Sequence, residues 1–483
     1  MQHRYSFNKP TLPFAKAATM LSSGRSLSSS ARYVILIIIT FTACILSILG
    51  LFHIKANPES MYYVDSIDYL AAARNIREYK TVYAGSFDEA IDEFAYSSRP
   101  PLYPLFIAIC YRVWADPLSI IIVQIAIFLT SSLFLYKVAA ILGMSYKYRC
   151  VIMALYMLHP IQLILTQQIM ADTLFQFCIL YSTWAMLRFL SDRKAMWLFH
   201  LDVVLLIAVF IKPALIYFWI INFALHAWLI FKFRLTRLIL ILTLLIPVAT
   251  SLWSVRNKHQ TGYYEFSSIK RFNLMYYANL IHTRVSGSSH TESFFQYLSE
   301  KTRGTPSYSD KATIEQREAL FVLKSHLPLA ILLQIKGMIH FFLDPGRQVL
   351  FEYVYGDAGP GILFAFISGG YSGILALLRT YHWVWIAILI LLMAINTIIC
   401  VFFILSLFSK LSYETGHVFM LLIIGYIVSV TGIIGSARYR LPVYPLILCM
   451  LPVGYGVLKN IASEILSNTK RFISTSKRPI EEI

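Results

Sequence analysis

Long apolar stretches recur along the chain and restrict its fold more than any other feature. Runs without a charged residue lie at 33–52, 383–407 and 441–458, and each approaches or exceeds the roughly 20 residues that a helix needs to cross a bilayer. A mean hydropathy of +0.63 lies outside the usual range of soluble domains. Short segments of alternating polarity, which are typical of membrane β-barrels, do not occur. The sequence therefore predicts an all-α polytopic membrane protein.

The net charge of +17 does not indicate nucleic-acid binding, because no polar domain combines basic and aromatic residues. In a membrane protein such a charge has two ordinary sources, basic cytoplasmic loops and sites that hold lipid phosphates. The six cysteines are scattered and form no CxxC pair, so neither a disulfide framework nor a zinc site is indicated. We expect no cofactor, although these residues do not rule out a bound divalent metal ion.

Basic clusters predict the orientation of the spans. The segment 1–32 has five Lys and Arg residues and no acid, so it should stay in the cytoplasm, followed by a retained signal-anchor helix at 33–52. The next loop should then be external, and its part 53–100 carries five basic and eight acidic residues. Later basic clusters predict ten spans, among them 196–211 and 214–231, or twelve if 325–378 forms a membrane hairpin.

The predicted organisation has three parts with two large extracytoplasmic loops. These parts are a disordered basic tail (1–32), a transmembrane catalytic domain (33–458) with external loops at 53–116 and at 254–324 or longer, and a cytoplasmic tail (459–483).

Acidic side chains stand at the predicted external ends of several spans. Asp65, Asp68 and Tyr69 follow the spacing i, i+3 and i+4, so one helical face can present all three. The alternative is that Asp65 only caps a helix at 66–77. Asp172 stands at the mouth of a span, where an ionisable group is a functional candidate, or it caps the helix that follows.

Basic side chains stand at the same ends. Lys212, Arg256, Arg438 and Arg440 suit a negatively charged lipid phosphate, while a carboxylate takes a proton from an incoming hydroxyl. The two late arginines can instead simply mark an interface. Arg99 opens a Pro-rich turn into a short amphipathic helix at 101–114, and we expect this helix to lie on the outer membrane surface. The turn itself can also serve only to stiffen the loop.

Taken in order, these motifs resemble those of the GT-C glycosyltransferases. That family uses polyprenyl-phosphate-linked sugars and includes protein O-mannosyltransferases and the bacterial aminoarabinose transferase for lipid A. The resemblance covers most of the chain and is weakest at 325–379. It rests on Asp65-Ser66-x-x-Tyr69-x-x-x-Ala73, Arg99-Pro100-Pro101-x-Tyr103-Pro104, Pro160 through Ala171-Asp172-Thr173, Lys212-Pro213, Trp253-x-x-Arg256-Asn257 and Arg438-Tyr439-Arg440-x-Pro442-x-x-Pro445.

The resemblance implies a GT-C fold and an inverting transfer on the external face, with Asp65 as general base. Many relatives have Asp-Glu where this chain has Asp65-Ser66, so the role of that Glu is absent or passes to Asp68. The lone acid at Asp172 argues against the metal-dependent oligosaccharyl branch. The implied donor-phosphate ligands are Lys212, Arg256, Arg438 and Arg440, and the implied substrate-binding residues are Tyr69, Arg99, Tyr103 and Asp172.

The implied partners are a polyprenyl-phosphate-sugar donor, a glycan, lipid or protein acceptor, and the bilayer of a bacterial inner membrane, with the site facing the periplasm. Two other functions remain open. A transporter or flippase of lipid-linked sugars needs charged groups deep within its spans, whereas the charges here stand at span ends. A polymerase of such sugars usually carries its key Arg and His residues in a large late loop, whereas here the carboxylate-bearing first loop dominates.

Overall fold

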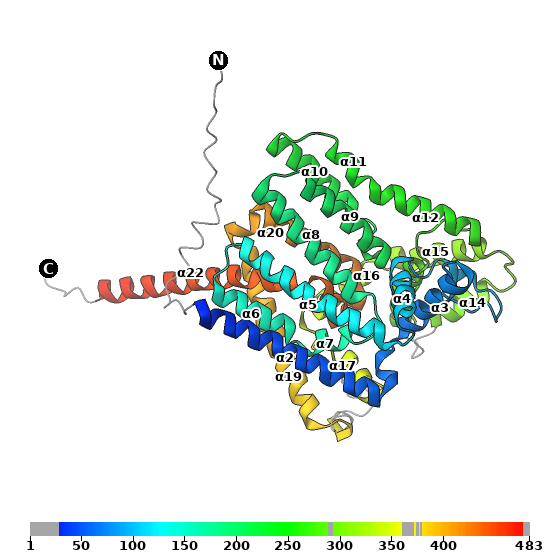
Figure 1. Cartoon of the computed structure of the whole chain (residues 1–483), viewed down its shortest axis with the longest axis horizontal. Helices are drawn as coiled ribbons and strands as arrows, with labels where there is room; N and C mark the ends of the chain where they lie inside the picture. The colour runs from blue at the N-terminus through cyan, green and yellow to red at the C-terminus, as the bar shows by residue number, and fades with distance from the viewer. Residues whose placement is uncertain (1–28, 288–292, 360–370, 373–375, 377–378, 477–483) are drawn as a thin grey trace, which may run out of the picture.

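The computed structural model describes residues 29–287, 293–359, 371–372, 376 and 379–476. Within these ranges the chain is helical and contains no strand (Figure 1). The α-helices are α2 (Ser29–Ala56), α3 (Val64–Tyr79), α4 (Leu102–Val113), α5 (Leu118–Ile141), α6 (Tyr146–Met157), α7 (Pro160–Thr166), α8 (Asp172–Asp192), α9 (Met196–Ile211), α10 (Phe218–Phe233), α11 (Ile239–Thr243), α12 (Leu245–Thr261), α13 (Ile269–Ser286), α14 (Ser293–Lys301), α15 (Tyr308–Ser325), α16 (Leu327–Leu343), α17 (Arg347–Tyr355), α19 (Trp383–Leu407), α20 (Thr415–Thr431), α21 (Ala437–Arg440) and α22 (Tyr444–Ser476).

The described residues contain seven helical segments that are long and apolar enough to cross a membrane, or nine if two bent helix pairs each count as one span. The fold class of an all-α polytopic membrane protein is therefore confirmed, and the described residues contain fewer candidate spans than the ten to twelve predicted. Part of the difference lies in α9 and α10, which have 16 residues each. At 1.5 Å per residue each is about 24 Å long, shorter than a typical hydrocarbon core of about 30 Å.

The predicted hairpin at 325–378 is only partly described. Its first half is α16, which meets α15 at a bend of 91°, and most of 360–378 lies outside the described residues. Most of the N-terminal tail, residues 1–28, also lies outside them. At the other end α22 continues as one helix to Ser476, so the segment from residue 459 extends the last helix, which projects from the bundle in Figure 1.

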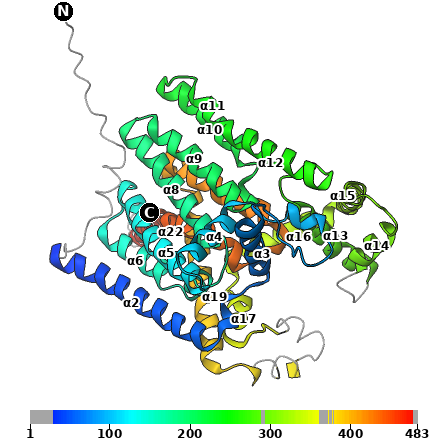
Figure 2. The same cartoon turned by 45° about the vertical axis from the view of Figure 1, so that its right-hand side comes forward.

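The polar segments gather at one end of the molecule. Figure 2 shows α3 and α4, which come from the first predicted external loop, on the same side as α13, α14 and α15 from the second. The free end of α22 lies at the opposite end in Figure 1. The helix predicted at 101–114 is present as α4, and the helix predicted at 66–77 is present as α3. The two predicted external loops are therefore neighbours in space.

Buried glutamines inside the bundle fix the segment that joins α7 to α8. Gln124 of α5 donates to the carbonyls of Thr166 at 3.0 Å and Gln168 at 2.7 Å. Gln176 of α8 exchanges hydrogen bonds with the side chain of Gln162 and donates to the carbonyl of Leu441. Carbonyls at helix breaks have no partner within their own helix. The two glutamine amides therefore stabilise the break between α7 and α8 and the break after α21.

A second polar cluster lies within the apolar helices. The Asp202 carboxylate in the middle of α9 is fully buried; it accepts a hydrogen bond of 2.6 Å from Asn222 and lies 3.4 Å from Nε2 of His226, both on α10. The prediction that charges stand only at the ends of apolar segments is therefore wrong for Asp202. His226 belongs to the same cluster and is itself fully buried.

Close contact between α19 and α22 depends on a glycine. A Cβ added to Gly454 would lie 1.9 Å from the carbonyl oxygen of Phe402, whereas one added to Gly456 would meet no atom within 4 Å. We expect Gly454→Ala to lower the free energy of unfolding by about 1–3 kcal/mol, the usual cost of overpacking. Gly456→Ala should preserve or raise stability, because alanine is the better helix former. Thermal unfolding of both variants in detergent tests this, and equal midpoints would contradict it.

Candidate functional site

The carboxylate of Asp65 lies between two arginines that are remote in sequence. Its Oδ1 accepts a hydrogen bond of 2.8 Å from Nη2 of Arg99, and its Oδ2 is bonded to Nη2 of Arg438. Burial alone would raise the pKa of Asp65, but Arg438 and Arg99 outweigh burial and hold that pKa well below its ordinary value. The carboxyl group is therefore ionised, and its side chain, 21% exposed, remains accessible to a ligand.

The first turn of α3 sets the direction of this carboxylate. Asp65 is not the N-cap of the helix; that position belongs to Tyr63, whose backbone N–H donates to Oγ of Ser66 at 2.8 Å. Ser66 in turn donates to the carbonyl of Ile169 at 2.8 Å, and the N–H of Ile169 donates to the carbonyl of Met61 at 2.9 Å. The capping alternative is therefore wrong for Asp65. Ser66 instead ties the helix start to the segment before α8.

Arg99 connects both acids of α3. Its Nε and Nη2 each lie 3.0 Å from Oδ2 of Asp68, and its guanidinium lies 4.9 Å from the ring centre of Tyr69. The ring of Tyr69 meets the ring of Tyr103 edge to face, and the Tyr103 hydroxyl donates to Gln124 at 2.6 Å. Burial raises the pKa of Asp68 even though Arg99 opposes the shift. The sequence motif around Arg99 thus shapes one wall of the site.

Asp172 and Lys212 form the other side. Nζ of Lys212, directly after α9, donates to Oδ1 of Asp172 at 2.6 Å, and Nε of Arg438 lies 3.5 Å from the second oxygen, Oδ2. The side chain of Asp172 is only 1% exposed. Asp172 is the first residue of α8, and the N-cap of that helix is Ala171. The Asp172 side chain therefore pairs with Lys212 and Arg438 and does not cap the helix. Arg438 therefore bridges Asp65 and Asp172.

Aromatic rings surround these cations. The guanidinium of Arg438 lies 4.8 Å from the ring centre of Tyr63 and 5.8 Å from that of Tyr439. Lys212 lies 5.7 Å from the Tyr439 ring and 5.9 Å from that of Phe175. Ring faces attract cations and exclude water from them, which strengthens their action on an anion.

The charges of this cluster, which we call the Asp65 site, balance. Three carboxylates (Asp65, Asp68 and Asp172) face three cations (Arg99, Lys212 and Arg438). An anionic ligand must therefore share a cation with a carboxylate. In the described part of the chain no group of three His, Cys, Asp or Glu side chains is arranged to hold a metal ion.

Two predicted phosphate ligands lie outside the Asp65 site. The guanidinium of Arg256 donates to the carbonyls of Val82 at 2.6 Å and Tyr96 at 2.8 Å. Arg440 is buried and donates to the carbonyls of Phe341 at 3.1 Å and Asp344 at 3.1 Å, near the end of α16. Both guanidiniums hold backbone carbonyls, so the structure does not bring either of them to Asp65.

Other members of the arrangement were not predicted. Tyr63, Ser66 and Gln124 each orient a neighbour of Asp65 or the segment before Asp172. A usable signal existed for Gln124, because an amide within an apolar helix needs a partner there. For Tyr63 and Ser66 the sequence offered only their nearness to Asp65.

Comparison with known proteins adds no assignment to this geometry. No protein-family model matches the chain, and no curated protein matches it.

Proposed function

We propose that this protein is a membrane glycosyltransferase that moves a sugar from a polyprenyl-phosphate donor to a hydroxyl of a glycan, lipid or protein, with inversion at the anomeric carbon. The observation that carries the proposal is the carboxylate of Asp65, held by Arg99 and Arg438 at the end of an apolar bundle. This geometry supports the resemblance of the motifs to the GT-C family. A bacterial inner membrane, with the site on its outer face, is part of the proposal.

The reaction is a single displacement. The acceptor oxygen forms a bond to the anomeric carbon as the bond from that carbon to the phosphate oxygen breaks, and the electron pair leaves with the polyprenyl phosphate. Asp65 takes the proton of the acceptor hydroxyl. The leaving phosphate needs no proton, because Lys212 and Arg438 offset its charge. Positioning and charge complementarity supply most of the acceleration in such a scheme.

The balanced charges give the donor a role in activating the base. A carboxylate with two arginines is a weak base, and a useful general base has a pKa close to the working pH. When a donor phosphate draws Arg438 to itself, Asp65 loses one of its two cations and its pKa rises. Binding of the lipid phosphate would thus make Asp65 a better base in the donor complex than in the free protein.

The direct test is transfer of a labelled sugar in membranes that carry the wild-type protein. We would offer several polyprenyl-phosphate sugars and follow label into lipid, glycan and protein fractions. Transfer that depends on one donor supports the proposal. No transfer from any donor, with the protein present at normal level, would overturn it.

Transport of a lipid-linked sugar is a second candidate, favoured by one observation. Asp202, Asn222 and His226 place an ionisable cluster inside the apolar helices. Among the described residues, Oδ2 of Asp202 and Nε2 of His226, which lie 3.4 Å apart, and Oδ1 of Asn222 have no hydrogen-bond partner. Buried ionisable groups within membrane helices often mark transport paths.

Asp202→Asn separates the two candidates, because it removes the charge and keeps the shape. A glycosyltransferase centred on Asp65 should retain at least about half of its transfer activity, since Asp202 has no contact with the Asp65 site. The measurement is transfer beside translocation of a fluorescent lipid-linked sugar in vesicles. Translocation by the wild type that is lost in Asp202→Asn would favour transport.

A further inference from the structure

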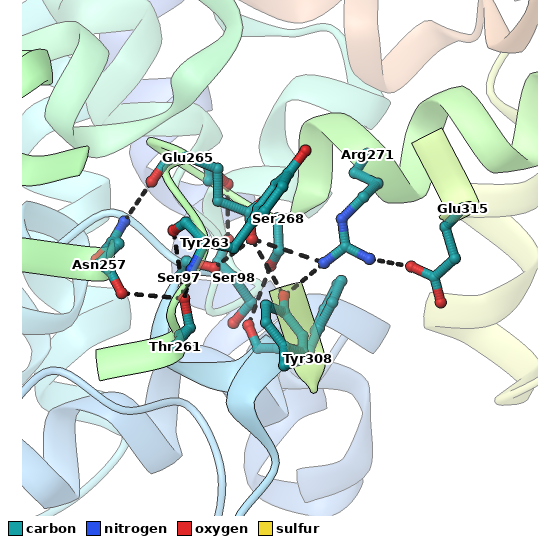
Figure 3. A network of polar contacts seen from close by, with 12 residues as sticks. Ser97, Ser98, Asn257, Thr261, Tyr263, Glu265, Ser268, Arg271, Tyr308 and Glu315 are labelled. Atoms are coloured by element: carbon teal, nitrogen blue, oxygen red, sulfur yellow. Dashed lines mark hydrogen bonds and ion pairs between the residues drawn. The ribbon is translucent and has the colours of Figure 1, made fainter. Parts of the chain in front are cut away.

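Figure 3 shows a charged network away from the Asp65 site, in the second external loop. Arg271 of α13 is buried, with 4% of its side chain exposed. Its guanidinium is bonded to Glu315 and to the hydroxyl of Tyr308, both on α15, and lies 3.6 Å from Glu265. Burying a charge is costly unless it is paired, and here one arginine joins α13, α15 and the segment before α13.

The same network reaches the first external loop. Glu265 accepts a hydrogen bond of 2.9 Å from the Ser97 hydroxyl through the oxygen that also accepts from Tyr308. Ser268 donates to first-loop carbonyls twice: its N–H to that of Ser97 at 3.1 Å and its hydroxyl to that of Phe94 at 3.0 Å. The hydroxyl of Ser267 donates to the Ser98 carbonyl at 3.1 Å. The segment 94–98 is thus fixed by residues 265–268.

The end of α12 also forms hydrogen bonds to the first loop. Arg256 donates to the carbonyls of Val82 and Tyr96. Its neighbour Asn257 donates to the carbonyls of Glu265 at 2.8 Å and Phe266 at 3.1 Å. The segment that holds Ser97 is therefore itself held by a buried amide, and the contact has support from α12, α13 and α15.

The residue that follows Ser98 is Arg99. Pro100 and Pro101 come next, so the backbone beyond Arg99 has little freedom. A side chain that must reach both Asp65 and Asp68 needs a fixed backbone, because a displacement of about 1 Å can cost about 100-fold in rate. The contacts of Ser97 and Ser98 supply that fixed point on the N-terminal side.

We propose that Arg271, with Glu265, is a positioning device that sets Arg99 against Asp65 through Ser97 and Ser98. Arg271 has no contact with the Asp65 site, so it is a positioning residue. The inference rests on the proposed function for its catalytic consequence. The structural link itself is independent of that function and is measured separately.

The structural link is tested by amide hydrogen exchange of the full-length protein in detergent. The peptide spanning 94–103 should exchange at least about fivefold faster in the double variant Ser97→Ala/Ser268→Ala, which loses two side-chain bonds that hold this segment. It should do so in Arg271→Met as well, because Glu265, the acceptor for Ser97, loses the cation beside it. The double variant leaves the pairs of Arg271 intact, which covers the case in which Arg271→Met unfolds the loop. Glu318→Gln is the matched control, since it breaks the 2.9 Å pair with Lys301 on α14 and has no bond to the first loop.

The catalytic consequence is tested by a double-mutant cycle on transfer. We expect Ser97→Ala/Ser268→Ala to lower kcat about 10-fold or more with little change in the donor KM. In an Arg99→Met background the same changes should have almost no further effect, because they act through Arg99. A merely structural role would lower kcat equally in both backgrounds.

The outcomes are separable. Unchanged exchange of 94–103 in both variants overturns the positioning device, whatever the protein's activity. Faster exchange together with equal kcat losses in the wild-type and Arg99→Met backgrounds overturns the proposed effect on catalysis, because the loss then does not act through Arg99. Absence of donor-dependent transfer by the wild type overturns the proposed function, and the exchange result then still decides whether the link between the loops exists.

Discussion

Asp65→Asn is expected to lower donor-dependent transfer about 100-fold or more while the protein remains folded. The amide keeps the shape of the carboxylate and can still accept a hydrogen bond from Arg99 or Arg438, but it cannot take the acceptor proton. General-base catalysis typically contributes 10²–10⁴-fold. The measurement is the initial rate of sugar transfer, with protein level and thermal stability matched to the wild type.

Asp68→Asn is the control for this prediction. Asp68 is bonded to Arg99 alone among the three cations, and its side chain is more exposed than that of Asp65. We expect its replacement to lower transfer less than Asp65→Asn does. If Asp68→Asn abolished transfer and Asp65→Asn did not, the base would be Asp68. If both variants kept full activity, neither carboxylate would be the base.

The sequence predicted several residues that the structure brings together. Asp65, Asp68, Arg99 and Asp172 were all singled out from their place next to apolar segments, and the structure brings them together with Lys212. Their meeting depends on Arg438, which is 373 residues from Asp65 in the chain. The expected topology put Arg438 on the same face, but no local pattern indicates that it bridges two carboxylates.

The arginines show where sequence reasoning fails. Arg256 and Arg438 both stand at ends of apolar segments, so their sequence surroundings do not distinguish their contacts. One meets the carbonyls of Val82 and Tyr96, while the other meets Asp65. The difference depends on which carbonyls the irregular loop segments leave without a helical partner, and this is a property of the folded chain.

The difference between the predicted spans and the candidate spans among the described residues has a related cause. Residues 196–231 are apolar apart from His200, Asp202, Lys212, Pro213, Asn222 and His226, so the lengths of α9 and α10 depend on where the helices break. The break at Lys212 also brings its ammonium group to Asp172. Asp202 stands in the middle of an apolar segment, where the sequence analysis expected no charge. Asn222 and His226, four residues apart on α10, are the sequence signal for its partners.

Arg438→Met is expected to weaken donor binding about 100-fold, the largest effect on affinity that we predict. Arg438 joins Asp65 and Asp172, and truncating one partner of a buried charged pair typically costs about 2–5 kcal/mol. Without it the buried carboxylate of Asp172 keeps only Lys212, and a donor phosphate loses the cation that it would share with Asp65. The donor KM in the transfer assay, or direct titration with polyprenyl phosphate, measures this effect.

Lys258→Met is the matched control for this loss, because Lys258 is an exposed cation at the end of α12. It removes the same charge from the chain without touching the Asp65 site, so the donor KM should stay within about twofold. A shared weakening in both variants would indicate general attraction of the anionic lipid, which salt screens. Loss confined to Arg438→Met at both low and high salt would instead indicate direct contact with the phosphate, because a partly buried pair is screened much less than an exposed one.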